Sequence, residues 1–224
     1  MPPRPLILGL TGSIGSGKSF VSSLFGRANA VVICADAVAR DIVAPASQAL
    51  QEIVAHFGPS VLRADGSLDR QALAGMVFSD PAQRHVLESI IHPRVRQREL
   101  EIIQDHKEHP LIVIDVPLLY ETGFETECDR VLTVLVSDTV RYQRLAESRS
   151  MSPAAVDQRL ASQMPQREKA RRSHFLVDNS AGRPYTCNQV NRILHRLFPA
   201  GLPQPLTEST LDPLLPGASA APPH

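Results

Sequence analysis

The segment Gly12-Ser-Ile-Gly-Ser-Gly-Lys-Ser19 fits the pattern G-x-x-x-x-G-K-[ST], which describes a phosphate-binding loop. The apolar run 5–10 before it is typical of a buried strand. After the loop, Phe20, Val21, Leu24 and Phe25 recur at helical spacing. Strand, glycine loop and helix therefore follow one another in the order that this chemistry needs, and the sequence predicts a nucleoside-triphosphate site.

Each residue type in the loop has a chemical role. The glycines allow the backbone to turn tightly and to point successive N–H groups inward, and the helix N-terminus adds partial positive charge at the same point. Lys18 is expected to reach the β/γ-phosphates of the nucleotide, and the Ser19 hydroxyl is expected to be a ligand to Mg²⁺. The predicted nucleotide-binding residues of this segment are Gly12, Ser13, Ile14, Gly15, Ser16, Gly17, Lys18, Ser19 and Phe20.

Composition favours an α/β protein with an aliphatic core and no net charge. The 224 residues include 23 Lys and Arg against 23 Asp and Glu, and no Trp. This balance argues against a dedicated nucleic-acid-binding protein, which is usually basic, and no apolar run approaches the roughly 18 residues of a membrane span. The three cysteines have neither metal nor disulfide spacing. We expect no signal peptide, no membrane partner and a cytoplasmic location.

Four further apolar runs predict a parallel sheet with helical crossovers. They cover residues 31–34, 111–115, 131–136 and 175–179. In open α/β sheets, ligands bind beyond the carboxyl ends of the strands. Asp36 lies just past the second strand, so we expect an active-site role for it, with a helix N-cap as the alternative. Asp115 ends the third predicted strand and could hold metal-bound water.

The segment between the second and third of these runs is mostly helical in pattern. Helices are predicted over 47–57, 68–78 and 86–91, and His92-Pro93 is expected to mark a helix boundary. This is too much helix for one connection between strands, so we expect an insertion. A lone histidine such as His92 is more often structural than catalytic.

Residues 141–172 are strongly basic, with eight Lys and Arg against three Asp and Glu. Arg141 and Arg144 lie three residues apart, on one helical face. A solvated basic surface or a nucleic-acid patch is the alternative, but Tyr142 is the only aromatic residue available for base stacking. We therefore favour a mobile lid that brings arginine to the transferring phosphoryl group.

The motifs of this chain, in their order along the sequence, resemble those of the dephospho-CoA kinase family over roughly residues 5–198. The loop and its lead-in are shared in part with other kinases, whereas five further motifs are more specific. They are Ala35-Asp36 with Ala39-Arg40; His56-Phe-Gly58 followed by Asp65-Gly-Ser-Leu-Asp-Arg70; Ile91-His-Pro93; Pro117-Leu-Leu-Tyr-Glu121; and Arg159-Leu-Ala-Ser-Gln163 with Asp178-Asn179.

The resemblance implies a P-loop kinase fold, an α/β fold whose parallel sheet is flanked by helices. It implies a core of about 4–36, 108–140 and 173–198, a helical substrate-binding insertion of about 37–107, and an arginine-rich lid of about 141–172. A closing helix is expected over 191–198, and the seven prolines of 199–224 indicate a flexible tail.

The resemblance also implies phosphorylation of the ribose 3′-hydroxyl of dephospho-CoA, with ATP and Mg²⁺. Asp36 matches the proposed general base, Arg144 matches the lid arginine, and Asn179 falls in the segment near the adenine. The catalytic set is then Asp36, Lys18 and Arg144. The implied substrate-binding residues are Asp36, Arg40, His92, Pro117, Leu118, Leu119 and Glu121.

Some positions depart from the family pattern. Ser13 replaces a usual Gly, Phe20 a Thr, Cys34 an Asp, and Ser173-His174 an Ala-Asp pair. The family's second lid arginine would fall at Ser148, with Arg149 displaced by one, so Arg144 is preferred to Arg149 for the lid role. Two other readings compete with the family assignment. One is another small-molecule P-loop kinase, acting on a nucleoside, a nucleotide or a shikimate-like substrate. The other is a nucleotide switch, although the guanine-binding pattern N-K-x-D is absent.

Overall fold

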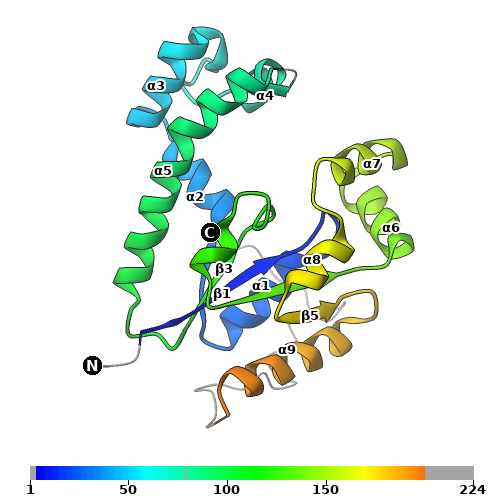
Figure 1. Ribbon diagram of the computed structural model, residues 1–224. Helices are drawn as coiled ribbons and strands as arrows, with labels where there is room; N and C mark the ends of the chain where they lie inside the picture. Colours follow the sequence, from blue (N-terminus) through cyan, green and yellow to red (C-terminus); the bar gives the residue numbers. More distant parts are fainter. Residues whose placement is uncertain (1–3, 79, 200–224) are drawn as a thin grey trace. The chain divides into compact units, whose positions relative to one another are not determined.

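The computed structural model describes residues 4–78 and 80–199 (Figure 1). The chain forms two compact units. We call Met1–Val32 with Lys107–His224 the core unit, and Ile33–His106 the helical unit. The predicted proline-rich tail lies outside the described residues, except for Pro199. Within 4–78 and 80–199, no helix combines the length and the apolar character needed to cross a membrane.

A sheet with the strand order β2-β3-β1-β4-β5 forms in the described part of the chain. Its strands are β1 (Leu6–Thr11), β2 (Val31–Cys34), β3 (Leu111–Asp115), β4 (Arg130–Leu135) and β5 (Phe175–Asp178). The pairings of β1 with β3, β1 with β4, and β4 with β5 are parallel. Each predicted strand is confirmed to within one residue at either end. The central strand β1 is the one that leads into the phosphate loop.

Alternation along the strands gives the sheet two buried faces. Leu8 and Leu10 on one face join Leu111 and Val113 in a core cluster that also contains residues of α1 and α9. Gly9 points to the opposite face, where an added Cβ would lie 2.6 Å from Leu119 Cδ1. Each fully buried aliphatic side chain contributes about 1.5–3 kcal/mol. This core therefore fixes the position of the loop that follows β1.

The core unit contains helices in addition to the sheet (Figure 1). They are α1 (Lys18–Arg27), α6 (Asp138–Arg149), α7 (Pro153–Ala161), α8 (Gln166–Arg172), α9 (Arg183–Leu197) and the short 3₁₀ turn η2 (Phe124–Glu127). Helix α7 begins at a cap, since the Ser152 hydroxyl accepts from Ala155 N, with Pro153 in the first turn. The predicted lid segment 141–172 thus contains most of α6, all of α7 and all of α8.

The helical unit has its own small core. It contains α2 (Ala35–Ile42), α3 (Gln48–Phe57), the 3₁₀ turn η1 (Pro59–Val61), α4 (Arg70–Phe78) and α5 (Pro81–Asp105). Leu50 and Ile53 of α3 pack with Val61 and Leu73 in one buried cluster. Periodic apolar residues from successive helices therefore close a second core, separate from that of the sheet.

The Asp65–Arg70 motif holds a turn and a helix start. The Asp65 carboxylate accepts hydrogen bonds from the Ser67 N–H and hydroxyl, around Gly66 at φ +78°. Asp69 Oδ1 accepts from the backbone N–H groups of Gln71 and Ala72 and so caps α4. This motif therefore has a structural role, since it forms a turn and caps the helix that follows.

The predicted helix boundary at His92-Pro93 is wrong. Helix α5 is continuous over 25 residues with Pro93 inside it. Proline removes a backbone donor, and its ring crowds the carbonyl four residues earlier, which normally breaks a helix. Here α5 packs along α2, α3 and α4, and Arg94 Nη2 donates to Glu52 Oε1 of α3 over 2.7 Å. Tertiary packing therefore overrides the local signal.

Candidate active site

The phosphate loop turns into α1 at Gly17, which has φ +79° and is the residue before the helix. A side chain at this position would be strained, and its Cβ would clash with the Asn179 side-chain amide. Ser16 N donates to Ser13 O over 3.1 Å, which closes the turn at the tip of the loop. The predicted strand–loop–helix arrangement is confirmed.

Asn179 holds the loop from the side of β5. Its Nδ2 donates to Ser16 O over 2.8 Å, and its Oδ1 accepts from the Thr186 hydroxyl over 2.9 Å. Asn179 and Thr186 are both buried. The position of Asn179 near the adenine, implied by the family resemblance, stays a prediction, whereas its contact with the phosphate loop was not predicted from the sequence. The signal available was an Asn directly after the last strand.

Lys18 forms an ion pair with Asp115, which lies buried at the carboxyl end of β3. The lysine ammonium has three donors, so it can keep this partner while it contacts a phosphate oxygen. Ser19 is exposed in the first turn of α1. Magnesium prefers oxygen ligands and is commonly held by one or two protein groups together with substrate phosphates. The Ser19 hydroxyl and the Asp115 carboxylate are oxygen ligands of this kind.

Arg144 of α6 approaches the same loop. Its Nη1 lies 3.5 Å from where a Gly17 Cβ would be, and this nitrogen is buried with no hydrogen-bond partner among residues 4–78 and 80–199. Its neighbour Arg141 is only 2% exposed and donates to Gln166 Oε1 over 2.9 Å. Burial lowers the pKa of Arg141, which Asp138 partly opposes. Of the two arginines, Arg144 is therefore the one that presents a guanidinium nitrogen to the loop.

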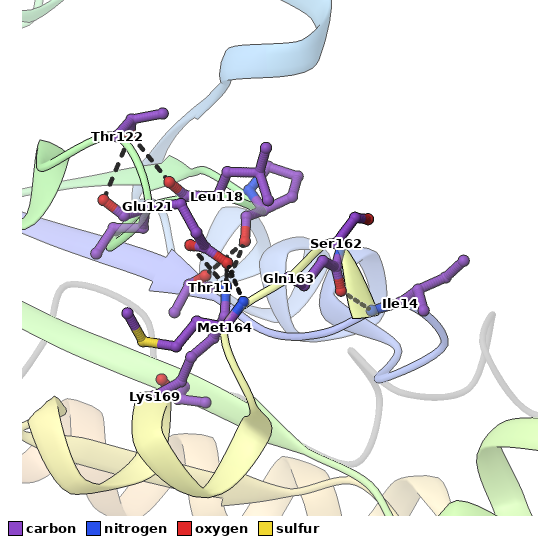
Figure 2. A network of polar contacts seen from close by, with 12 residues as sticks. Thr11, Ile14, Leu118, Glu121, Thr122, Ser162, Gln163, Met164 and Lys169 are labelled. Carbon is purple, nitrogen blue, oxygen red and sulfur yellow. Dashed lines mark hydrogen bonds and ion pairs between the residues drawn. The ribbon is translucent and has the colours of Figure 1, made fainter. Parts of the chain in front are cut away.

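The turn after β3 holds four predicted substrate-binding residues. The Pro117 carbonyl accepts hydrogen bonds from the Thr11 hydroxyl and from Lys169 Nζ. The Glu121 carboxylate forms an ion pair with the same Lys169 (Figure 2). Leu118 is 40% exposed, whereas Leu119 is fully buried beside Gly9. Leu119 was predicted to contact the substrate, but its side chain packs inside the protein instead. Leu118 is the leucine that offers apolar surface to a ligand.

Asp36, Arg40 and His92 belong to the helical unit, and their side chains are exposed there. Asp36 lies in the first turn of α2, where the N-cap residue is Cys34. The alternative that Asp36 is the N-cap is therefore wrong. Arg40 Nε donates to the Asp36 carbonyl over 3.0 Å, which leaves the Asp36 carboxylate on the surface of this unit. The approach of this carboxylate to the phosphate loop of the core unit stays a prediction.

Comparison with known proteins identifies the family of this chain. The family model for dephospho-CoA kinase matches residues 6–184. The chain belongs to the dephospho-CoA kinase family. A dephospho-CoA kinase from Symbiobacterium thermophilum is 43% identical over 186 residues, which cover 82% of this chain and 78% of that one. Another, from Anaeromyxobacter dehalogenans, is 43% identical over 190 residues, covering 84% of this chain and 90% of its own length.

A solved structure shares the fold of this chain. A crystal structure of a protein from Thermus thermophilus aligns with a TM-score of 0.80 at 32% identity, covering 88% of this chain and 99% of that chain. The resemblance read from the sequence is confirmed, and with it the parallel α/β fold of a P-loop kinase. The chain is a transferase that uses ATP.

Proposed function

We propose that this chain transfers the γ-phosphoryl group of ATP to the ribose 3′-hydroxyl of dephospho-CoA, giving coenzyme A and ADP. The observation that carries the proposal is the approach of Lys18 and Arg144 to one glycine loop, in a chain of this family. Both side chains are in the core unit, beside the phosphate loop, whose backbone N–H groups would bind the phosphates of the nucleotide. The proposed cytoplasmic location rests on the sequence alone.

Phosphoryl transfer depends mostly on positioning and on electrostatic stabilisation of the transferring group. In our proposal the loop amides and Lys18 hold the β- and γ-phosphates. Arg144 closes over the γ-phosphoryl group and stabilises the charge that shifts toward the leaving ADP. The Ser19 hydroxyl would hold Mg²⁺, which would supply further positive charge at the phosphates when bound.

Asp36 is the proposed acceptor of the proton from the attacking 3′-hydroxyl, or the group that orients it. The exposed carboxylate at the start of α2 supports this role, because it can accept a hydrogen bond from a ribose hydroxyl. Arg40, His92 and Leu118 are the proposed contacts to the rest of dephospho-CoA. Each has side-chain surface available to a ligand.

A turnover screen of hydroxyl acceptors tests the proposal. ADP release is measured with Mg²⁺ and ATP in the presence of dephospho-CoA, adenosine, AMP or shikimate. We expect kcat/KM for dephospho-CoA to exceed the others by at least roughly 100-fold, because specificity reflects differential binding in the transition state. A preference for adenosine, AMP or shikimate would assign a different kinase reaction. Rapid ADP release without any acceptor would indicate a nucleotide-hydrolysing switch.

A further inference from the structure

A chain of polar contacts joins the lid to the turn after β3 (Figure 2). It begins at Lys169 of α8, whose side chain is 0% exposed. Lys169 Nζ donates to the Pro117 carbonyl over 2.8 Å and pairs with Glu121 Oε1 over 2.9 Å. Burial lowers the pKa of Lys169, while the hydrogen bond to Glu121 raises it. The ammonium is therefore enclosed between one carboxylate and one carbonyl.

The same carboxylate holds the backbone between α7 and α8. Glu121 Oε1 accepts from the Met164 N–H over 2.7 Å. A charged acceptor makes this a stronger bond than one between neutral groups. The Glu121 side chain is 21% exposed, so solvent screens the pair only in part. The Lys169–Glu121 pair thus fixes the peptide that follows Gln163.

Gln163 makes the last contact, directly to the phosphate loop. Its Oε1 accepts from the Ile14 N–H over 3.0 Å. A backbone N–H carries one hydrogen, so this bond sets the direction of the peptide between Ser13 and Ile14. Asn179 binds the Ser16 carbonyl further along the same loop. Two side chains from distant parts of the chain therefore hold the loop at two of its peptides.

We infer that Gln163 is a positioning residue for the phosphate loop, held in place by the Glu121–Lys169 ion pair through the backbone of Met164. A loop already in its bound conformation loses less conformational freedom when phosphate binds. Gln163 thus increases affinity for phosphates without touching them. The inference rests on the proposed binding of ATP by this loop, and it adds a role for the Arg159–Gln163 motif.

The test measures nucleotide binding without any acceptor, so it is independent of which hydroxyl is phosphorylated. Gln163→Met removes the acceptor and keeps a side chain of similar length. We expect Kd for ATP and for ADP, from calorimetry with Mg²⁺, to rise about 5- to 10-fold, which matches one lost hydrogen bond. Kd for adenosine, from an NMR titration, should not change, because adenosine has no phosphate. Gln158→Met in the exposed part of α7 is the matched control, with unchanged affinities.

A second variant tests the link to the ion pair. Glu121→Ala combined with Lys169→Met removes both charges, because removing only one would leave a buried ion unpaired. The ATP Kd should rise as in Gln163→Met, and adding Gln163→Met to this pair should raise it little further, since interacting residues are not additive. If the double variant does not fold, the Gln163→Met measurement decides alone.

Three results would overturn the inference. One is an ATP Kd for folded Gln163→Met within about twofold of the parent. Another is an equal loss of adenosine and ATP affinity, which would indicate a general structural defect. The third is full additivity of Gln163→Met with the charge-free pair, which would make the two contacts independent.

Discussion

Arg141 and Arg144 show how two like residues on one helix acquire different chemistry. Arg141 donates to Gln166, and its buried Nε, which has no hydrogen bond in the described part of the chain, lies 3.5 Å from the Asp138 carboxylate. Arg144 instead places a buried Nη1, also without a hydrogen-bond partner among the described residues, beside Gly17 of the phosphate loop. An unpaired buried donor costs on the order of 1–3 kcal/mol. A phosphate oxygen at the loop would satisfy it, which is the physical reason to give Arg144 the phosphate contact.

Arg144→Ala should therefore lower kcat by about 10²-fold or more, with a smaller change in the Kd of dephospho-CoA. The lost guanidinium acts on charge that develops in the transition state. Steady-state kinetics and a separate binding titration measure the two effects. Gln143→Ala, an exposed change on the same helix, is the control. Weaker dephospho-CoA binding at an unchanged kcat would reassign Arg144 to the substrate.

Asp36→Asn should fold, bind ATP and lose at least about 10²-fold in kcat. The amide keeps the shape of the side chain but cannot accept the hydroxyl proton in the same way. Asp41→Asn, an exposed change on the same α2, is the matched control. Turnover close to that of the parent enzyme would remove Asp36 from the mechanism.

At the scale of elements, α5 shows how packing changes what a local sequence does. It continues through Pro93 and also buries a carboxyl group, Glu99, which is 3% exposed. Burial raises the pKa of Glu99 to about 7, and Arg96 opposes this shift. The residue is thus held mostly protonated below neutral pH in the folded chain.

The raised pKa of Glu99 predicts that the stability of the folded chain depends on pH. Its folded-state pKa lies above the ordinary value of 4.5, so the folded chain binds more protons than the unfolded chain between about pH 4.5 and 7. Its stabilising contribution is full below pH 4.5 and is lost as pH rises toward 7. Glu99→Gln removes this loss and should raise the free energy of unfolding by about 2–3 kcal/mol at pH 8 relative to its effect at pH 4.5.

Denaturant unfolding of the full chain at pH 4.5 and pH 8 measures this difference. The control is Glu101→Gln on the same helix, an exposed carboxylate whose pKa is lowered by hydrogen bonds from Gln97 and Arg98. It should not reproduce the gain at pH 8. Equal shifts for Glu99→Gln at both pH values would show that Glu99 ionises normally in the folded chain.

At the scale of the whole molecule, the proposed reaction requires both units. The core unit supplies the phosphate loop and Arg144, and the helical unit supplies Asp36, Arg40 and His92. Phosphoryl transfer needs the attacking oxygen in line with the γ-phosphorus. The proposed mechanism therefore predicts that the bound substrates bring the Asp36 carboxylate to the γ-phosphoryl group.

A crystal structure with ADP and dephospho-CoA should show this arrangement directly. We expect the Asp36 carboxylate within hydrogen-bonding distance of the ribose 3′-hydroxyl, about 2.6–3.2 Å, on the side that faces the β-phosphate of ADP. A 3′-hydroxyl that points away from the loop, or an Asp36 turned into solvent, would contradict the proposed chemistry.

Local patterns were sufficient to predict much of the fold. The glycine loop and the apolar runs act through nearby backbone geometry, so the strand limits follow from the sequence to within one residue. The helical pattern of 86–91 indicated part of α5, but its continuation beyond Pro93 depends on packing against α2, α3 and α4. The family resemblance implied a substrate contact for Leu119, whereas its burial beside Gly9 follows from how the turn packs on the sheet.

The sequence by itself determined the kind of protein this is: the loop residues, the α/β order and the family all follow from residues close together in the chain or from motifs in a fixed order. Only the tertiary structure decided which side chains support the loop. Gln163 and Asn179 reach Ile14 and Ser16 from more than 140 residues away. Such contacts depend on how strands and helices pack, because a side chain carries no local signal of the distant backbone group that it will bind.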